Sequence, residues 1–341
     1  ETRDSVLVWF EEGEPDLLFR NEGEGRFTSI PLDGGVLRDE TGAPITEPLR
    51  DWGLHARFQD IDGDGRPDLY VANDFESPDR IWLNAGDGTF RAMRALSTRK
   101  GSLSSMAVDF SDVDRDGDTD FFVVEMLSRD HEKRLRQMGT MAPSPQPLGA
   151  IDNQPQYMGN SLFLNRGDGT YAEVSEQAGV RRSDWSWSTL FLDVDLDGYE
   201  DILVSTGHHY DVQDSDANQL IRNRTAMGRL DMERAMLLFP PLEVANALFR
   251  NRGDGSFEEV TEDWGFMEAD VSHGMASADF DGDGGPDLVV NRLGYPVAVY
   301  RNVTSAPRIR VRLRGRAPNT HGIGATVRLM GGAVDQSKEI I

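Results

Sequence analysis

The chain has 341 residues, of which 59 are acidic and 35 are basic, and its formal net charge is −24. This charge argues against a nucleic-acid partner, which is bound by neutralising phosphates with Lys and Arg, and against adhesion to anionic lipid. No apolar run is long enough to cross a membrane, so we expect no membrane span. The absence of cysteine leaves metal ions, rather than disulfides, as candidate cross-links in an oxidising compartment.

The first predicted element is a tight β-hairpin in residues 18–27, where an apolar strand, a Gly-rich turn and an aromatic residue follow one another. The same pattern recurs at residues 82–90, 162–171 and 248–257, and a degenerate fifth copy at 299–305 lacks the Gly turn. We interpret residues 5–30 as strands of a blade whose first strand and acidic loop are missing. Because the chain opens at Glu1 without an initiator Met, we expect a processed or partial chain.

A nine-residue acidic loop follows at residues 60–68 and recurs at 112–120, 193–201 and 279–287. Each copy has Asp at positions 1, 3, 5 and 9 and Gly at position 6. Alternating oxygen ligands around a sharp turn describe a loop wrapped around a hard cation, and calcium suits it better than the strictly octahedral magnesium. The candidate ligands are Asp60, Asp62, Asp64 and Asp68; Asp112, Asp114, Asp116 and Asp120; Asp193, Asp195, Asp197 and Asp201; and Asp279, Asp281, Asp283 and Asp287.

These loops differ from an EF-hand. An EF-hand needs a bidentate Glu at position 12 and a helix on each side. Position 12 is Val in all four copies, and each loop is followed by a strand-like apolar run, such as Phe121-Phe-Val-Val. The loops are therefore expected to join β-strands.

The loops and hairpins form a repeat. From the hairpin Asn to the first Asp of the next loop the distance is 28 residues in three intervals and 39 in the first. Each unit holds a lead strand, an acidic loop, a second strand and a hairpin, which is the four-stranded antiparallel blade of an all-β propeller. The predicted divisions are a partial blade (1–53), four blades (54–104, 105–184, 185–271 and 272–315) and a tail (316–341).

Two of the connections between the second and third strands are long. The first contains the segment 130–137 and the Pro-rich segment 142–147, and the second contains a plausible amphipathic helix over 226–238. Its Met and Leu residues are expected to pack onto the propeller, with a partner groove as the alternative. In the tail, residues 308–313 and 322–329 alternate like strands. Either blades are absent from this chain or the tail pairs with the N-terminal blade to close the ring.

The acidic loops paired with the hairpins, over roughly residues 15–305, resemble the FG-GAP/VCBS repeats of integrin α-subunit propellers and their bacterial relatives. Residues 319–325 and 71–80 are similar to the ASPIC/UnbV family, and the tail resembles the start of that domain. The resemblance implies a propeller, usually seven-bladed when complete, with about four Ca²⁺ ions in a secreted or cell-surface protein. It also implies one backbone carbonyl ligand per loop, at position 7: Arg66, Asp118, Tyr199 and Gly285.

Several shorter signals carry little weight. Arg166-Gly-Asp168 and Arg252-Gly-Asp254 spell an integrin-recognition tripeptide, but both lie where the hairpin turn needs Gly-Asp-Gly anyway. The pair His208-His209 is expected in a surface loop rather than in a transition-metal site. Trp185 and Trp187 could form a sugar-binding platform but are expected to pack between blades.

Two functions from different classes follow. The first is an extracellular, non-enzymatic, calcium-binding propeller that serves as a binding, adhesion or self-assembly scaffold, with self-association through the unfinished blade and the C-terminal strands. The alternative is a carbohydrate-binding lectin or a polysaccharide-active enzyme on the same propeller. Because propellers host many functions, the identity of the protein or glycan partner stays open.

Overall fold

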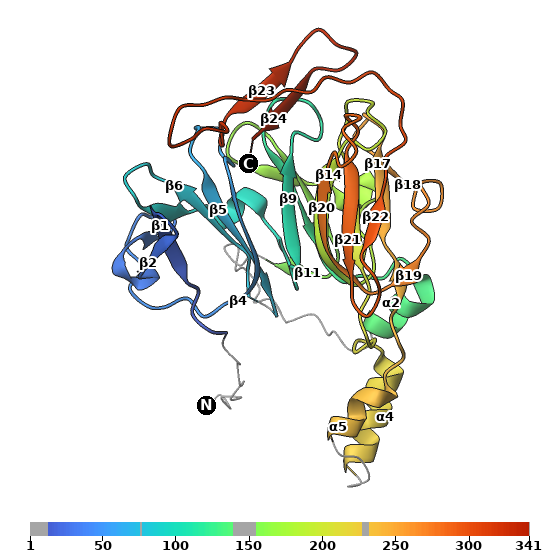
Figure 1. Ribbon diagram of the computed structural model, residues 1–341. Helices are drawn as coiled ribbons and strands as arrows, with labels where there is room; N and C mark the ends of the chain where they lie inside the picture. The colour runs from blue at the N-terminus through green and yellow to red at the C-terminus, as the bar shows by residue number, and fades with distance from the viewer. Residues whose placement is uncertain (1–12, 76, 139–154, 227–231, 341) are drawn as a thin grey trace.

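A computed structural model describes residues 13–75, 77–138, 155–226 and 232–340. It is a mainly β propeller arrangement of antiparallel blades with few helices, as the sequence predicts (Figure 1). Nothing is described for the Pro-rich segment 142–147 or for residues 5–12. The predicted domain boundaries remain predictions.

Each blade begins at a lead strand and continues outwards through neighbouring strands. The strands of the four sheets are listed in sequence order. The first sheet contains β4 (Trp52–Gln59), β5 (Asp68–Asp74), β6 (Arg80–Asn84) and β7 (Phe90–Ala92), with β3 (Leu37–Arg38) parallel to β7; the second contains β9 (Ala107–Ser111), β10 (Asp120–Val124), β12 (Ser161–Asn165) and β13 (Tyr171–Glu173); the third contains β14 (Ser186–Leu192), β15 (Asp201–Thr206), β17 (Ala247–Asn251) and β18 (Phe257–Glu259); the fourth contains β20 (Ser272–Ala278), β21 (Asp287–Arg292) and β22 (Ala298–Tyr300).

Smaller elements connect the blades. Their bounds are β1 (Leu18–Gly23), β2 (Arg26–Ile30), η1 (Leu32–Gly34), α1 (Ala95–Thr98), β8 (Gly101–Ser102), α2 (His131–Met138), β11 (Gln156–Tyr157), α3 (Ser175–Ala178), α4 (Ser215–Ala226), α5 (Met232–Ala235), η2 (Met236–Leu238), β16 (Val244–Ala245), β19 (Ala269–Asp270), β23 (Thr326–Leu329) and β24 (Gln336–Glu339). The pairs β1–β2, β8–β11, β16–β19 and β23–β24 form two-stranded sheets.

The hydrophobic core lies between the blades. The lead strands β4, β9, β14 and β20 are neighbours in that order. The second strands β10 and β15, which lie between two blades, are buried along their whole length. In β10, Phe121 belongs to the apolar cluster shared with the first blade, whereas Phe122 belongs to the cluster shared with the third. Successive side chains of a strand point to opposite faces, so a strand between two blades must be apolar at every position. This explains the continuous apolar run that follows each acidic loop.

A polar contact that we call the blade latch joins each of the first three blades to the next. A residue just before the third strand, Asp79, Asn160 or Asn246, accepts a backbone N–H from the end of the second strand, at 2.9 Å in each case. The same side chain is hydrogen-bonded to a serine at the head of the next blade. The pairs are Asp79 with Ser105 (2.8 Å), Asn160 with Ser183 (2.7 Å) and Asn246 with Ser272 (3.2 Å).

The helical insertion differs from the prediction. A helix was expected over 226–238, but α4 ends at Ala226 and a short helix and a 3₁₀ turn, α5 and η2, follow at Met232–Leu238, with residues 227–231 outside the described part. The helices project beyond the sheets (Figure 1). In η2, Met236 is 41% and Leu237 is 69% exposed, so these two do not pack onto the propeller. The turn of η2 directs them outwards, while Ala235 and Phe239 on either side are buried.

The tail also differs from the prediction. Residues 322–329 do contain β23, but residues 308–313 form no strand, because no described strand lies beside them to complete a hydrogen-bonded ladder. Strand β23 pairs with β24, not with β1 or β2, so the described tail does not close a sheet with the N-terminal hairpin. It instead crosses the end of the propeller that carries the acidic loops, where Glu339 accepts hydrogen bonds from Gln59 and the backbone of Asp60 (Figure 1).

The first blade latch is expected to be sensitive to pH. Burial raises the pKa of Asp79 from 3.8 to about 6, although Tyr70 and Ser105 donate hydrogen bonds to its carboxylate. A carboxyl whose pKa is higher in the folded state makes folding less favourable as pH rises from about 4 through about 6.

Asp79→Asn introduces the residue found in the other two latches. We expect the stability of this variant relative to the wild type to increase by about 1–3 kcal/mol when the pH rises from 4 to 8. Urea denaturation at both pH values in saturating calcium measures the change. The exposed Asp216→Asn is the control. A stability difference that does not vary with pH would contradict this account.

Candidate metal centres

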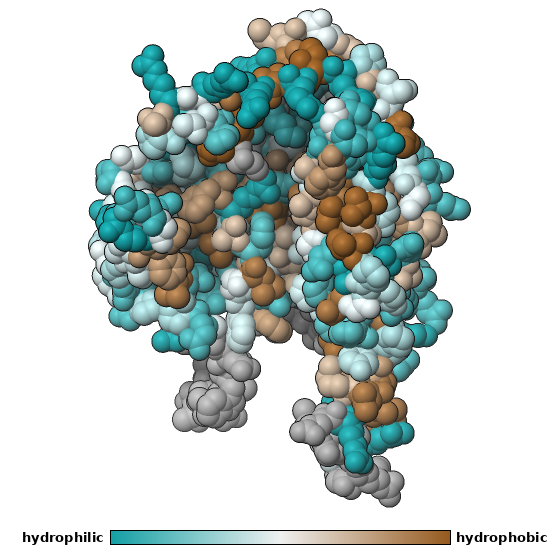
Figure 2. All heavy atoms as spheres, viewed as in Figure 1, coloured by the Kyte–Doolittle hydropathy of each residue, from teal (hydrophilic) through white to brown (hydrophobic). Residues whose placement is uncertain are grey.

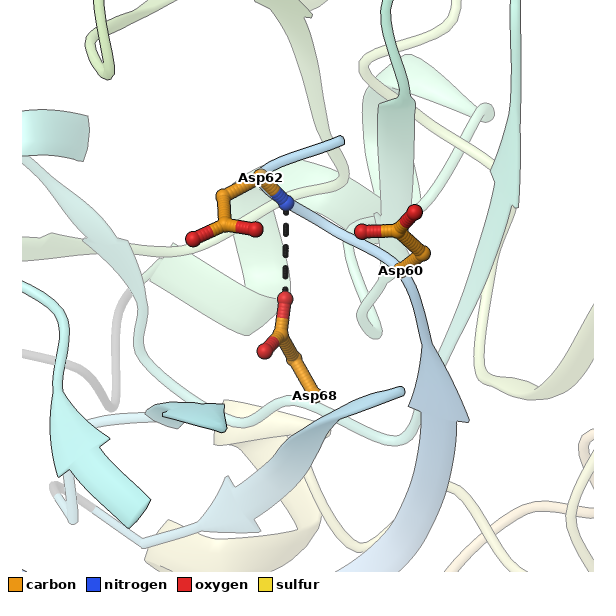
Figure 3. A group of neighbouring side chains, drawn as sticks. All are labelled: Asp60, Asp62 and Asp68. Carbon is orange, nitrogen blue, oxygen red and sulfur yellow. Dashed lines mark hydrogen bonds between the residues drawn. The ribbon is translucent and has the colours of Figure 1, made fainter. Parts of the chain in front are cut away.

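The four acidic loops each bring three Asp carboxylates together. The ligand oxygens within each group lie within 4.8 Å of one another. Figure 3 shows the first group, whose carboxylates face a common space between the end of β4 and the start of β5. The groups are Asp60, Asp62 and Asp68; Asp112, Asp114 and Asp120; Asp193, Asp195 and Asp197; and Asp279, Asp281 and Asp287.

Local hydrogen bonds curl each loop around this space. The carboxylate at position 1 accepts the backbone N–H of the Gly at position 6, as in Gly65 to Asp60 at 2.9 Å. The same bond recurs in the other three loops at 3.0–3.2 Å. The Gly at position 6 has a positive φ in every loop, 84° at Gly65, which explains why glycine recurs there. The carboxylate at position 5 accepts the N–H of position 7 in all four loops.

The Asp at position 9 connects each loop to the hairpin of its own blade. In the second loop, one oxygen of Asp120 accepts the N–H of Val113 at position 2 (2.8 Å), and the other accepts the N–H of the hairpin Asn165 (2.8 Å). Asp68, Asp201 and Asp287 make the same two bonds, at 2.7–2.9 Å. This carboxylate therefore fixes the loop and the hairpin relative to each other.

Burial makes these carboxylates unusual acids. It raises the pKa of Asp68 to about 6 and those of Asp120 and Asp201 to about 8, against the donated N–H groups. The fourth loop differs, because the N–H donated by Asn302 lowers the pKa of Asp287. In the first three loops, burial disfavours the ionised form of this carboxyl, and a nearby cation would favour it.

The remaining predicted ligands lie around the groups rather than in them. The carboxylates of Asp64, Asp116, Asp201 and Asp283 are outside the three-residue groups. Arginines pair with several loop carboxylates: Arg66 with Asp64, Arg250 with Asp195 and Asp197, Arg301 with Asp281, and Arg310 with Asp279. The ligand roles of the carbonyls of Arg66, Asp118, Tyr199 and Gly285 stay predictions.

The donor set suits a hard cation. Each group offers carboxylate oxygens alone, the ligands that calcium and magnesium prefer to nitrogen or sulfur. Backbone N–H bonds already orient these oxygens, so an ion would enter a loop whose turn is largely formed. The residues present therefore fit a bound divalent ion.

Other residues singled out in the sequence play structural roles in the described part. Trp185 is 8% exposed and stacks on His208 with ring centroids 4.3 Å apart, and Trp187 packs against the same core cluster. The prediction that both pack between blades is confirmed. His208 is half-buried, so the surface-loop prediction fits the exposed His209 better. Asp168 and Asp254 cap their hairpin turns by accepting from Thr170 and Ser256.

The loops and sheets define the class of protein to which the chain belongs. Residues 60–123, 150–204 and 238–290 match the model of the FG-GAP-like repeat, and these segments make up about half of the chain. The chain belongs to this family, which confirms the FG-GAP part of the resemblance. The ASPIC/UnbV resemblance of residues 319–325 lies outside the matched segments and stays a prediction.

Comparisons with individual proteins add little. No curated protein matches the chain. Among solved structures, it is similar to an Agrocybe aegerita lectin described as recognising non-reducing terminal N-acetylglucosamine, with 16% identity and a TM-score of 0.36. The match covers 85% of this chain and 61% of the lectin chain, less than two thirds of the latter. So distant a likeness carries no argument about a ligand. Within the described residues, no helix is long and apolar enough to cross a membrane.

We expect Asp120→Asn to destabilise the protein by about 1–3 kcal/mol in calcium, because an amide cannot accept both N–H groups through two carboxylate oxygens. The matched control is Asp118→Asn in the same loop, whose side chain lies outside the three-residue group. Thermal unfolding of both variants measures the difference. Equal unfolding temperatures for the two variants would show that position 9 has no special role.

Proposed function

We propose that this protein is a calcium-stabilised propeller that acts as an extracellular, non-enzymatic scaffold for binding or self-assembly. The observation that carries the proposal is the fourfold recurrence of one oxygen-lined loop, each joined to its blade through the Asp at position 9. An ion at such a place contributes to folding, because it offsets the repulsion among carboxylates on which both the loop and the hairpin depend.

Calcium is the ion that the loops suit best. The carboxylates lie on a flexible nine-residue turn, and calcium accepts six to eight oxygens in irregular geometry, whereas magnesium demands an octahedron and retains its waters. Open loops of this kind would fill at the millimolar calcium concentrations outside cells. The chain also has no cysteine, so bound ions would take the stabilising role that disulfides have in many extracellular domains.

The scaffold role rests on unpaired surfaces at the two ends of the row of blades. On β4 of the first blade, Leu54 is 50% and Phe58 is 48% exposed, and on β22 of the fourth blade Val299 is 62% exposed. Figure 2 shows apolar side chains gathered over the fourth blade. Equivalent faces of the inner blades are buried against neighbours, so these outer faces suit another blade-like surface.

Removing calcium should strongly destabilise the chain. Each site filled at a hundred times its dissociation constant adds about 2.7 kcal/mol, so several sites together should raise the unfolding temperature by at least about 10 °C. Melts in millimolar calcium, in the same concentration of magnesium and in excess EGTA measure this effect. Identical melting in calcium and in EGTA would overturn the proposal.

Self-association should depend on the outer face of the fourth blade. We expect light scattering after size exclusion to show concentration-dependent association, which Val299→Glu weakens by placing a charge on that face. Val303→Glu, at a residue that is 83% exposed and outside the strands, is the control. A chain that stays monomeric at high concentration would refute the self-assembly form of the proposal and leave only binding to other partners.

A further inference from the structure

A buried ion pair joins the second acidic loop to the third. Arg115 occupies position 4 of the second loop, and Glu200 occupies position 8 of the third. Their side chains are 7% and 8% exposed, and Arg115 Nη2 lies 2.6 Å from Glu200 Oε2. Burial of both partners distinguishes this pair from the exposed arginines beside the other loops, whose contribution to stability is small.

The backbone at position 4 of the acidic loops adopts a conformation that favours glycine. Arg115 has a φ of 66°, in the left-handed region that disfavours side chains. Position 4 has a positive φ in the other three loops as well, where the residues are Gly63, Leu196 and Gly282. Arg115, like Leu196, carries a conformational cost that glycine avoids, and the contacts of the arginine side chain offset part of it.

Those contacts all fall on one short segment of the third loop. Besides Glu200, the guanidinium donates a hydrogen bond to the carbonyl of Gly198 and lies over the Tyr199 ring, 5.5 Å from its centroid. Arg115 therefore touches positions 6, 7 and 8 of the third loop. This segment lies between Asp197 and Asp201, and it includes the carbonyl at position 7 that is the expected ligand.

A second connection runs alongside the first. The hairpin residue Asn251 donates its side-chain amide to the carbonyls of Val113 in the second loop (3.3 Å) and Glu200 in the third (3.2 Å). Between other neighbouring loops, the described contacts are neutral, such as Thr119 Oγ1 to the carbonyl of Asp60 at 3.1 Å. The pair formed by the second and third loops is thus linked both by charge and through the backbone.

We infer that Arg115 is a positioning residue that makes ion binding at the second and third loops interdependent. An ion that orders the second loop fixes the backbone of Arg115, and Arg115 then holds positions 6–8 of the third loop ready for an ion. The converse holds by thermodynamic linkage. This inference rests on the proposed function, because it requires that both loops bind ions.

The experiment measures ion binding at the third loop through luminescence that depends on Tyr199. Tb³⁺ serves as a luminescent substitute for calcium, and Tyr199 lies within that loop as its sensitiser. Tyr199→Phe keeps a ring beneath Arg115 but removes this sensitiser, so the luminescence that it abolishes defines binding at the third loop. Titrations then compare the wild type with variants of the second loop.

We expect Asp114→Asn, which removes a carboxylate of the second loop, to weaken Tb³⁺ binding at the third loop about tenfold. Arg115→Gln should weaken it similarly, and the double variant should be no weaker than Arg115→Gln alone, because the coupling has already been lost. Arg115→Lys keeps the charge but not the planar fork and should recover part of the affinity. Arg252→Gln, in the hairpin turn of the same blade, is the control for the loss of one charge.

Three outcomes would overturn the inference. Unchanged binding at the third loop in Asp114→Asn would do so even if the arginine variants failed to fold. Additive effects in the double variant, or equal weakening by Arg252→Gln, would attribute the effect to charge or general stability instead. Absence of any luminescence dependent on Tyr199 in the wild type would remove the ion site of the third loop and with it the inference, whereas the proposed function would fail only if melting in calcium and in EGTA were identical.

Discussion

The structure depends on one carboxylate in each blade, the Asp at position 9 of the acidic loop. Its two oxygens accept N–H groups from two segments that are distant in sequence, the loop and the hairpin that completes the same blade. In the first, second and fourth groups, that residue also faces the space where an ion would lie. The folding of the blade and the binding of the ion therefore depend on the same carboxylate.

Electrostatics explains why this constraint needs an ion. Burial raises the pKa of Asp120 and Asp201 to about 8, so ionising the carboxyl at position 9 costs free energy while no cation is near. Arginines beside the loops, such as Arg250 and Arg301, offset part of the negative charge, but their exposed positions limit what they contribute. A divalent ion at the centre of the loop stabilises all of its carboxylates at once.

Much of this arrangement could be predicted from the sequence. The spacing of the Asp residues predicted where the acidic loops lie. The continuous apolar runs indicated strands buried on both faces, as Phe121 and Phe122 confirm. The Asn of each hairpin was visible in the repeat, but its bond to position 9 was not, because a period does not say which atoms meet. The latch between Asp79 and Ser105 was missed for the same reason, since it joins two blades.

The failed predictions have physical causes as well. Alternating residues at 308–313 satisfy the pattern of a strand, but a strand also needs a neighbour, and within the described residues none lies there. Helix α4 was not predicted from the sequence, because Ser215–Ala226 holds few large apolar residues. Its start was nonetheless encoded, since Asp214 accepts the N–H of Ala217 and so caps the first turn.

Amide hydrogen exchange at Asn84, Asn165, Asn251 and Asn302 tests the central claim most directly. Their backbone N–H groups are donated to the carboxylates at position 9, at 2.7–2.9 Å. The account predicts that calcium slows exchange at these four amides much more than at the exposed hairpin turns. If calcium binds and exchange at these four amides does not change, the ions do not act through position 9 and the account is wrong.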